Sequence, residues 1–288
     1  MSVKFVAEVS SNHGRDLERS LAFVDEAKRI GADAVKFQLF RVNQLFAPEV
    51  LDWPNVSKRK AWELPYEFLA PIAERCRKQG IQFACTPFDL EAVEKLTPHV
   101  AFFKIASYEL LWHELLVACA KTGKPLVLST GMANEEEIGA AVEAVRKASD
   151  IPLTLLHAVS AYPTPPEQAN LATLETLRKK FDVDVGWSDH TVSPAVIERV
   201  VHRWGAEMVE FHLDLDGAGA EFESGHCWRG DEIKAVIERI RIAEKTDGSG
   251  IIGTAESEHE DRDWRADPSD GLRPLKSLRK QLLARENA

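Results

Sequence analysis

One pattern of hydrophobic and polar positions recurs along the chain. A segment with apolar residues at helical spacing leads into a glycine, and a short run rich in Val, Ile and Phe follows, as in LAFVDEAKRI-Gly31-ADAVKFQLF and VIERVVHRW-Gly205-AEMVEFHL. A glycine directly after the last helical residue is typical of a left-handed helix C-cap. We therefore interpret each copy of the pattern as a helix followed by a strand.

Eight apolar runs of this kind predict eight strands. Strands that alternate with helices pair in parallel, and runs such as PLVLS are typical of a parallel sheet covered on both faces. Eight units favour a closed (β/α)8 barrel, and an open doubly wound sheet is the alternative because periodicity does not report closure. The predicted strands are residues 4–9, 34–39, 81–85, 101–105, 125–129, 153–157, 183–187 and 208–212.

The chain length of 288 residues fits one such barrel. After Ile251 the helix and strand pattern gives way to a polar stretch with many charges. We predict a barrel domain over residues 1–250 and a polar C-terminal extension over residues 251–288.

Composition excludes several classes of function. A net charge of −10 opposes a nucleic-acid surface. No stretch of about 18 apolar residues is present and the N-terminus does not resemble a signal peptide, so we expect a cytoplasmic protein that does not bind membranes. The cysteines form no CxxC pair, which argues against a disulfide framework and against a cysteine-only zinc site: Cys76, Cys85, Cys119 and Cys227.

Two lysines lie inside apolar strands, Lys36 in AVKFQ and Lys104 in FFKIAS. A buried lysine is costly to desolvate unless an anion compensates it, so the pair predicts a bound phosphate and carboxylate at the strand ends. Pairing with Glu8 or Glu109 is the structural alternative. Hydroxyl groups at neighbouring strand ends favour the phosphate, namely Thr86, Ser107, Ser129 and Ser188.

His190 follows the seventh predicted strand, and His212 lies at the end of the eighth. Either residue taken singly is more often a hydrogen-bonded structural histidine. At neighbouring strand ends the two imidazoles predict an open divalent-metal site completed by water and substrate.

Seven segments resemble the N-acetylneuraminate (sialic acid) synthase family, and they occur in the family's order. The resemblance covers residues 3–245 and implies condensation of phosphoenolpyruvate with a sugar aldehyde, giving a 2-keto-3-deoxy sugar acid and phosphate. The segments are AEVSSNHG (7–14), GADAVKFQ (31–38), CTPFD (85–89), FFKIASYEL (102–110), LSTGMA (128–133), YPTP (162–165) and SDHT (188–191).

The resemblance also implies roles for individual residues. His190 and His212 would bind the metal, expected to be Mn²⁺ with Mg²⁺ or Co²⁺ as alternatives. The implied phosphoenolpyruvate-binding residues are Lys36, Thr86, Lys104, Ser107, Ser129, Ser160 and Ser188. The candidate catalytic residues are Glu8, Glu109 and Tyr162, and the candidate sugar-binding residues are Asn12, Gln38, Asp216 and Glu223.

The chain departs from the family pattern in three places. The family's sugar-contacting Asp-His pair falls on Glu223 and Ser224, which implies a different acceptor sugar, and nearby His226 is either a compensating residue or an ordinary loop residue. The family's C-terminal antifreeze-like domain is not expected after the barrel, although a homodimer is possible. A lysine of the family is not evident in residues 247–258, where Arg273 is a candidate substitute.

Two other functions compete with the synthase. A buried lysine with a lowered pKa, Lys36 or Lys104, could form a Schiff base as in an aldolase. A barrel that binds or senses a sugar acid without turnover is the second alternative, because of the altered loop.

Overall fold

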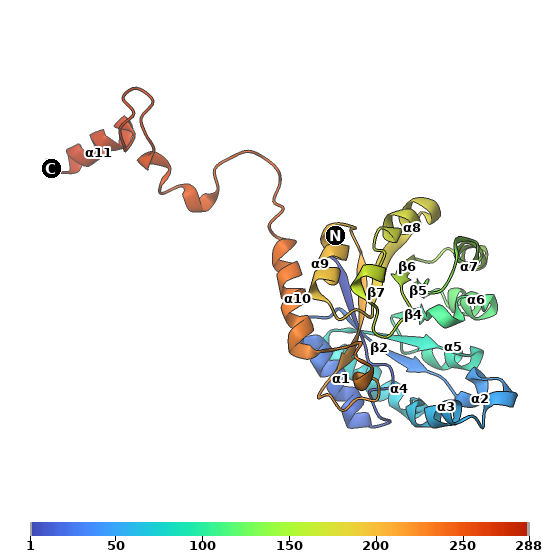
Figure 1. Ribbon diagram of the computed structural model, residues 1–288. Coiled ribbons are helices and arrows are strands. Elements are labelled where there is room, and N and C mark those ends of the chain that lie inside the picture. The colour runs from blue at the N-terminus through green and yellow to red at the C-terminus, as the bar shows by residue number, and fades with distance from the viewer. Residues whose placement is uncertain (1, 287–288) are drawn as a thin grey trace. The chain divides into compact units, whose positions relative to one another are not determined.

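Eight parallel strands form a closed barrel in the computed structural model, which describes residues 2–286. Each strand pairs with its neighbour along the chain, and β1 also pairs with β8, which closes the barrel and confirms the predicted (β/α)8 fold (Figure 1). The strands are β1 (Lys4–Glu8), β2 (Ala34–Leu39), β3 (Gln82–Pro87), β4 (Phe102–Ile105), β5 (Leu126–Ser129), β6 (Leu153–Ala158), β7 (Asp184–Asp189) and β8 (Met208–Asp214).

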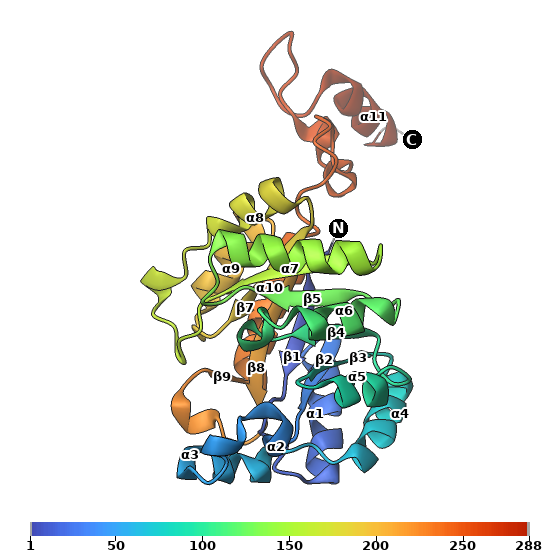
Figure 2. The same ribbon diagram turned by 90° about the vertical axis from the view of Figure 1, so that its right-hand side faces the viewer.

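Helices surround the strands (Figure 2). Asp16 caps the first helix by accepting a hydrogen bond from the backbone N–H of Arg19, and Gly80 ends α4 at a φ of 64°. The surrounding helices are α1 (Leu17–Arg29), α4 (Leu69–Gln79), α5 (Leu90–Leu96), α6 (His113–Lys121), α7 (Glu135–Ala148), α8 (Thr173–Phe181), α9 (Pro194–His202) and α10 (Gly230–Ala243). The short helices α2 (Val42–Leu45) and α3 (Pro54–Ser57) lie in the segment between β2 and α4.

The sequence pattern did not predict one further strand, β9 (Cys227–Arg229). It pairs in parallel with β8, with Cys227 opposite His212. Three residues are too few for hydrophobic periodicity to reveal. This strand matters because it returns the chain after β8 to the carboxyl ends of the barrel strands.

Alternation along the strands sets the barrel interior. One buried apolar layer contains Val6, Ala34, Ala84, Phe102, Val127, Leu156 and Met208. Side chains two residues apart on a strand point to the same face, so the residues two positions further on form the next interior layer. That second layer is mostly polar: Glu8, Lys36, Thr86, Lys104, Ser129 and Glu210. The apolar layer therefore underlies a polar one at the carboxyl ends.

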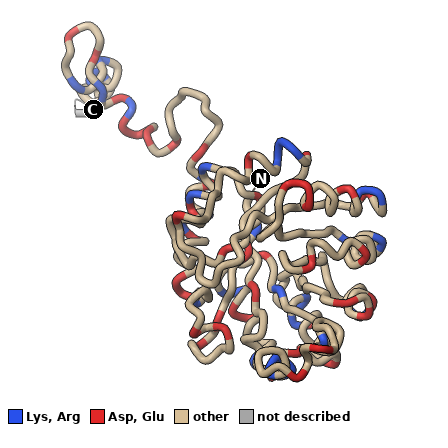
Figure 3. Tube along the Cα trace, turned by 45° about the vertical axis from the view of Figure 1, so that its right-hand side comes forward, with Lys and Arg blue, Asp and Glu red and all other residues tan. Residues whose placement is uncertain are grey.

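The chain divides into two units, Met1–Glu244 and Lys245–Ala288. The second unit contains α11 (Lys276–Glu286) and an ion pair of 2.7 Å between Arg279 and Asp270. Acidic and basic positions are interspersed along the first unit's outer segments (Figure 3). Within residues 2–286, no helix is both long and apolar enough to cross a membrane.

Candidate active site at the carboxyl ends of the barrel strands

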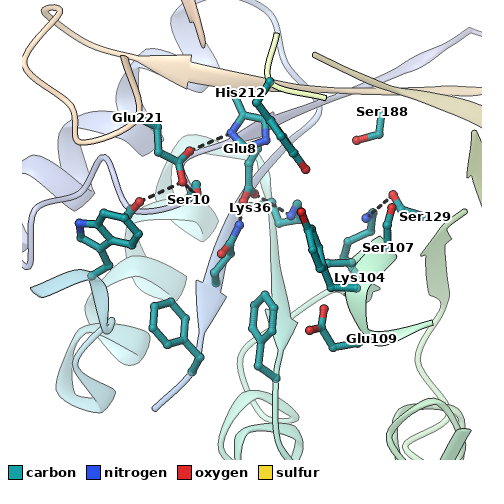
Figure 4. A pocket seen from close by; sticks show the side chains of 18 of the residues that line it. Glu8, Ser10, Lys36, Lys104, Ser107, Glu109, Ser129, Ser188, His212 and Glu221 are labelled. Atoms are coloured by element: carbon teal, nitrogen blue, oxygen red, sulfur yellow. Dashed lines mark hydrogen bonds and ion pairs between the residues drawn. The ribbon is translucent and has the colours of Figure 1, made fainter. Parts of the chain in front are cut away.

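A cavity of about 640 Å³ opens above the polar interior layer. Figure 4 shows Ser107, Ser129 and Lys104 on one side of it, His212 and Glu221 on the other side, and Lys36 between them. All of these residues line the cavity.

Lys36 is buried with two carboxylates. Its Nζ lies 2.7 Å from an oxygen of Glu8 and 3.7 Å from an oxygen of Glu210, and it donates a hydrogen bond of 3.2 Å to the Thr86 hydroxyl. Burial opposes the charged form, but Glu210 and Glu8 outweigh burial and raise the pKa of Lys36 above its ordinary value. Lys36 is therefore a fixed cation.

Lys104 is equally buried but has fewer acidic neighbours. Its Nζ donates to the Ser129 hydroxyl at 2.7 Å and to the carbonyl of Ile105 at 3.0 Å, and it lies 3.7 Å from Glu210. Burial lowers the pKa of Lys104 to about 8, with Glu210 opposing this shift. A bound anion would stabilise the ammonium form, so Lys104 is the cation most responsive to a ligand.

Glu210 stands between the two lysines, and sequence reasoning missed it. The same oxygen lies 3.7 Å from each ammonium and accepts a hydrogen bond of 3.2 Å from Ser188. Burial alone would raise the pKa of Glu210. The charges of Lys104 and Lys36 lower it by more, so the pKa of Glu210 lies below its ordinary value. Its position two residues before His212 in MVEFHLD was the available signal, because alternate strand residues share a face.

Two predicted phosphate ligands meet at Gly131. Its backbone N–H donates to the Ser107 hydroxyl at 3.0 Å, and a Cβ on Gly131 would lie 2.5 Å from the hydroxyl oxygen of Ser160. The Ser160 hydroxyl is buried without a hydrogen-bond partner among the described residues. Ser107 lines the cavity, whereas Ser160 and Thr86 lie outside its lining.

The structure brings His190 and His212 together, with ring centroids 5.4 Å apart. Nδ1 of His190 is 2.8 Å from the carbonyl of Val159, and burial lowers the pKa of this imidazole to about 3, so it is neutral. Tyr162 packs against it, with ring centroids 4.2 Å apart. A neutral imidazole held through one nitrogen leaves the other for a ligand.

A third imidazole and a carboxylate complete this cluster. The rings of His226 and His212 have centroids 4.6 Å apart, and an oxygen of Glu221 lies 3.1 Å from Nδ1 of His212. Glu223 was predicted to bind the sugar, but its side chain is exposed and outside the cavity lining, whereas Glu221 lines the cavity. The difference arises in the loop after β8, whose conformation the sequence pattern does not report.

Of the four predicted sugar ligands, Gln38 alone is among the described residues that line the cavity. Its side chain donates to Glu8 at 2.6 Å. Asn12 is buried beside the cavity and accepts a hydrogen bond of 2.8 Å from the backbone N–H of Glu221. Asp216 pairs with Arg19 at 2.8 Å on the surface. Asn12 and Asp216 therefore lie where they support the loop after β8.

Glu109 and Tyr162 both line the cavity. One carboxyl oxygen of Glu109 is buried without a hydrogen-bond partner in the described part of the chain. Burial raises the pKa of Glu109 to about 7, with Lys104 opposing the shift. A carboxyl group that is partly ionised near neutral pH can both accept and donate a proton.

An aromatic wall limits the cavity on the side of the segment between β2 and α4. Arg59 lies over the rings of Trp62 and Phe46, at 5.3 and 5.6 Å from their centroids. The wall consists of Phe40, Leu45, Phe46, Trp62 and Phe88. This side can contact apolar substituents of a ligand whose charged end lies at the lysines.

Comparisons with known proteins identify the family to which the barrel belongs. The NeuB family model matches residues 23–252. An uncharacterized protein of Methanocaldococcus jannaschii is 38% identical over 85% of this chain and 72% of its own length. Pseudaminic acid synthase of Campylobacter jejuni is 33% identical over 87% of this chain and 76% of its own length.

Among solved structures, N-acetylneuraminic acid synthetase of Leptospira borgpetersenii, in complex with citrate, superposes with a TM-score of 0.80 at 31% identity. The match covers 94% of this chain and 93% of that one. The predicted sialic acid synthase resemblance is confirmed at the level of the family. This chain belongs to the NeuB family.

Proposed function

We propose that this enzyme condenses phosphoenolpyruvate with the open-chain aldehyde of an amino sugar, giving a nonulosonate (a 2-keto-3-deoxy sugar acid) and phosphate. One observation carries the proposal: two buried lysines and a histidine cluster face the same cavity from different sides. The lysines suit a small phosphorylated acid, and the histidines suit a metal that holds a sugar oxygen. The names of the relatives, pseudaminic acid synthase and N-acetylneuraminic acid synthetase, support the same reaction class.

Phosphoenolpyruvate would bind at the lysines. Lys104, Ser129 and Ser188 offer an ammonium and two hydroxyls within one region of the cavity. Lys36 supplies a second cation that lines the cavity. These groups would hold the phosphate and the carboxylate while the vinyl carbon C3 stays free to react.

The residues opposite fit a divalent metal. His190 and His212 are buried, and Nδ1 of His190 lies beside the carbonyl of Val159, the arrangement that orients a metal-binding imidazole. Mn²⁺ suits this mixed nitrogen and oxygen environment, with Mg²⁺ and Co²⁺ as alternatives. When bound, the ion would supply Lewis-acid polarisation of the sugar aldehyde.

The chemistry forms one C–C bond and breaks one C–O bond. C3 of phosphoenolpyruvate attacks the aldehyde carbon, whose oxygen gains a proton and becomes a hydroxyl, and water adds to the positive charge that develops at C2. Loss of phosphate from the resulting tetrahedral carbon leaves the 2-keto acid. Glu109 would take the proton from water, because its pKa of about 7 permits transfer near neutral pH. Glu8, next to Lys36, is the alternative group for this role.

The aromatic wall indicates what kind of sugar binds. An acyl group on nitrogen and a deoxy carbon are apolar, and such groups are stabilised by contact with Phe and Trp rings. Tyr162, at the histidine cluster, would border the reacting aldehyde. We therefore propose an acetamido or deoxy amino sugar as the acceptor.

Phosphate release tests the proposal. The purified enzyme is incubated with phosphoenolpyruvate, Mn²⁺ and a panel of amino-sugar aldehydes, and with each component omitted in turn. Phosphate should appear only when all three are present, and phosphoenolpyruvate labelled with ¹⁸O in its bridging position should yield labelled phosphate. Ligand binding without turnover for any aldehyde would instead favour the sugar-acid binding protein.

A Schiff-base aldolase is favoured only by the lowered pKa of Lys104. Borohydride reduction in the presence of pyruvate should leave the protein mass unchanged if the synthase proposal holds. A stable adduct on Lys104 would establish the aldolase. The predicted cytoplasmic location and homodimer stay predictions.

A further inference from the structure

The loop that follows β8 brings a carboxylate and an imidazole to His212. β9 pairs with β8 so that Cys227 lies opposite His212, which places His226 beside it. The side chain of Asn12 fixes the same loop by accepting from the N–H of Glu221 and donating to the carbonyl of Leu213 at 3.1 Å. Glu221 and His226 are thus held next to His212 by the backbone.

Among residues 2–286, the ion-pair partners of Glu221 are the imidazoles of His212 and His226, with no lysine or arginine. One of its oxygens accepts hydrogen bonds from Ser10 at 2.5 Å and Ser11 at 3.0 Å, and the other faces His212 and His226. Ser10, which makes the shorter of these contacts, has a φ of 48°, in the left-handed region. The groups around this largely buried carboxylate are hydroxyls and imidazoles, the same kinds of group that surround a carboxylate ligand of a divalent ion.

His226 is buried and makes no hydrogen bond through either ring nitrogen to the described residues. Its Nε2 lies 3.6 Å from an oxygen of Glu221, which is beyond hydrogen-bonding distance, and its Nδ1 has no partner. A buried polar group without a hydrogen bond requires another explanation. A cation between this imidazole and the carboxylate would supply one.

The spacing of the donor atoms fits a shared ion. Bonds of about 2.1 Å to nitrogen and oxygen place neighbouring ligand atoms about 3.0–3.4 Å apart. The same Glu221 oxygen lies 3.1 Å from Nδ1 of His212 and 3.6 Å from Nε2 of His226. Ligand atoms of His212, Glu221, His226 and Cys227 all lie within 4.8 Å of one another. Cys227 is turned to the amide of Asn12, at 3.6 Å.

We propose that Glu221 and His226 are direct ligands of the divalent ion bound by His190 and His212. The site is then built from three imidazoles and one carboxylate, and it should select Mn²⁺, Fe²⁺ or Co²⁺ over Mg²⁺, which prefers oxygen ligands alone. This inference deepens the proposed function, since the ion is the one that would polarise the aldehyde. It concerns which residues of this chain hold that ion.

Metal binding without substrates tests the inference. The demetallated protein is titrated with Mn²⁺ by calorimetry, and the bound Mn²⁺ is analysed by pulsed electron paramagnetic resonance for coupled ¹⁴N nuclei. The wild type should show three coupled imidazoles, and His226→Gln should show two. Glu221→Gln and His226→Gln should each weaken Mn²⁺ binding by about 100-fold or more. Removing a residue that only hydrogen-bonds to a metal ligand weakens metal binding by about 10–100-fold.

Glu223→Gln is the matched control, because it makes the same chemical change two residues away on an exposed side chain. It should bind Mn²⁺ as the wild type does. Circular dichroism and the melting temperature should show that all variants are folded. Two coupled imidazoles in the wild type, or Mn²⁺ affinity unchanged in the Glu221 and His226 variants, would overturn the inference.

Cys227→Ser should also retain Mn²⁺ affinity, and its loss would contradict a ligand set of nitrogen and oxygen. Because no substrate is present, the outcome is separate from the proposed function. Tight Mn²⁺ binding without phosphate release would refute the synthase and leave the ligand set intact. Phosphate release by the wild type, together with unchanged Mn²⁺ affinity in the Glu221 and His226 variants, would refute the ligand set and leave the proposed function intact.

Discussion

An oxygen of Glu210 lies 3.7 Å from Nζ of Lys104, and the same oxygen lies 3.7 Å from Nζ of Lys36. One buried carboxylate is thus shared by two buried cations. Lys36 has a second carboxylate, Glu8, at 2.7 Å, whereas no second carboxylate of the described residues lies within ion-pair distance of Lys104. This asymmetry accounts for the raised pKa of Lys36 and the lowered pKa of Lys104. The two lysines therefore have different parts in binding an anion.

Replacing Glu210 should change how both lysines titrate. Glu210→Gln removes the charge that favours their ammonium forms, so the pKa of Lys104 should fall below about 8. The high-pH limb of kcat/KM for phosphoenolpyruvate should move to lower pH by about one unit. Glu207→Gln, on a partly exposed carboxylate near the start of β8, should leave the profile unchanged. An unshifted limb in Glu210→Gln would contradict the shared-carboxylate interpretation.

Lys104 should impose a high-pH limit on phosphoenolpyruvate binding. Its folded pKa of about 8 lies below the ordinary lysine value of 10.5, so the ammonium needed for the anion is lost as pH rises through about 8. We expect kcat/KM to fall tenfold for each pH unit above that point. In Lys104→Arg this fall in kcat/KM should disappear, because a guanidinium stays charged. The value of kcat/KM should be lower than that of the wild type at all pH values, because the guanidinium has a different shape.

Binding of phosphoenolpyruvate should also take up protons near pH 8. The bound anion favours the ammonium of Lys104 and raises its pKa, so a fraction of a proton enters with the ligand. Calorimetry in buffers of different ionisation enthalpy measures this uptake. It should vanish at pH 6, where Lys104 is already protonated, and at pH 8 in Lys104→Arg.

Glu109 should affect turnover more than binding. Its pKa of about 7 makes it the candidate for proton transfer, and Glu109→Gln should lower kcat by about 10²–10⁴-fold with little change in KM for phosphoenolpyruvate. The low-pH limb of kcat near pH 7 should be lost as well. Glu114→Gln, in the first turn of α6 outside the cavity lining, is the control. A selective rise in KM would instead assign Glu109 to substrate binding.

Gly131 should be intolerant of any side chain. A Cβ there would lie 2.5 Å from the Ser160 hydroxyl and 2.7 Å from the Ser107 hydroxyl, so Gly131→Ala should displace both groups and weaken phosphoenolpyruvate binding by at least about tenfold, the effect of losing about one hydrogen bond. Gly139→Ala is the matched control. Gly139 lies inside α7, and a Cβ there would lie 3.6 Å from the Phe181 ring, an ordinary contact distance. The free energy of unfolding should therefore stay equal or rise by about 0.5–1 kcal/mol. Thermal melts and binding titrations check both.

The family and the barrel could be predicted from local features of the chain. The repeated helix, glycine and apolar run specifies a βα unit, and eight units can bury their apolar faces only by closing or by stacking into an open sheet. Lys36, Lys104, His190 and His212 were recognisable because each lies inside an apolar run or directly at its end, where a polar side chain is costly to bury without a partner. Those interpretations needed only neighbouring residues.

The tertiary structure alone decided closure, shown by the pairing of β1 with β8, and the composition of the two sides of the cavity. Glu210 becomes significant only when two strands distant in sequence place lysines on either side of it. Glu221 rather than Glu223 enters the cavity because Asn12 and β9 set the path of the loop after β8, and such contacts leave no periodic signal. Sequence patterns report which face a residue occupies within its own element. The partner across the barrel depends on strand register and loop conformation, which the whole fold determines.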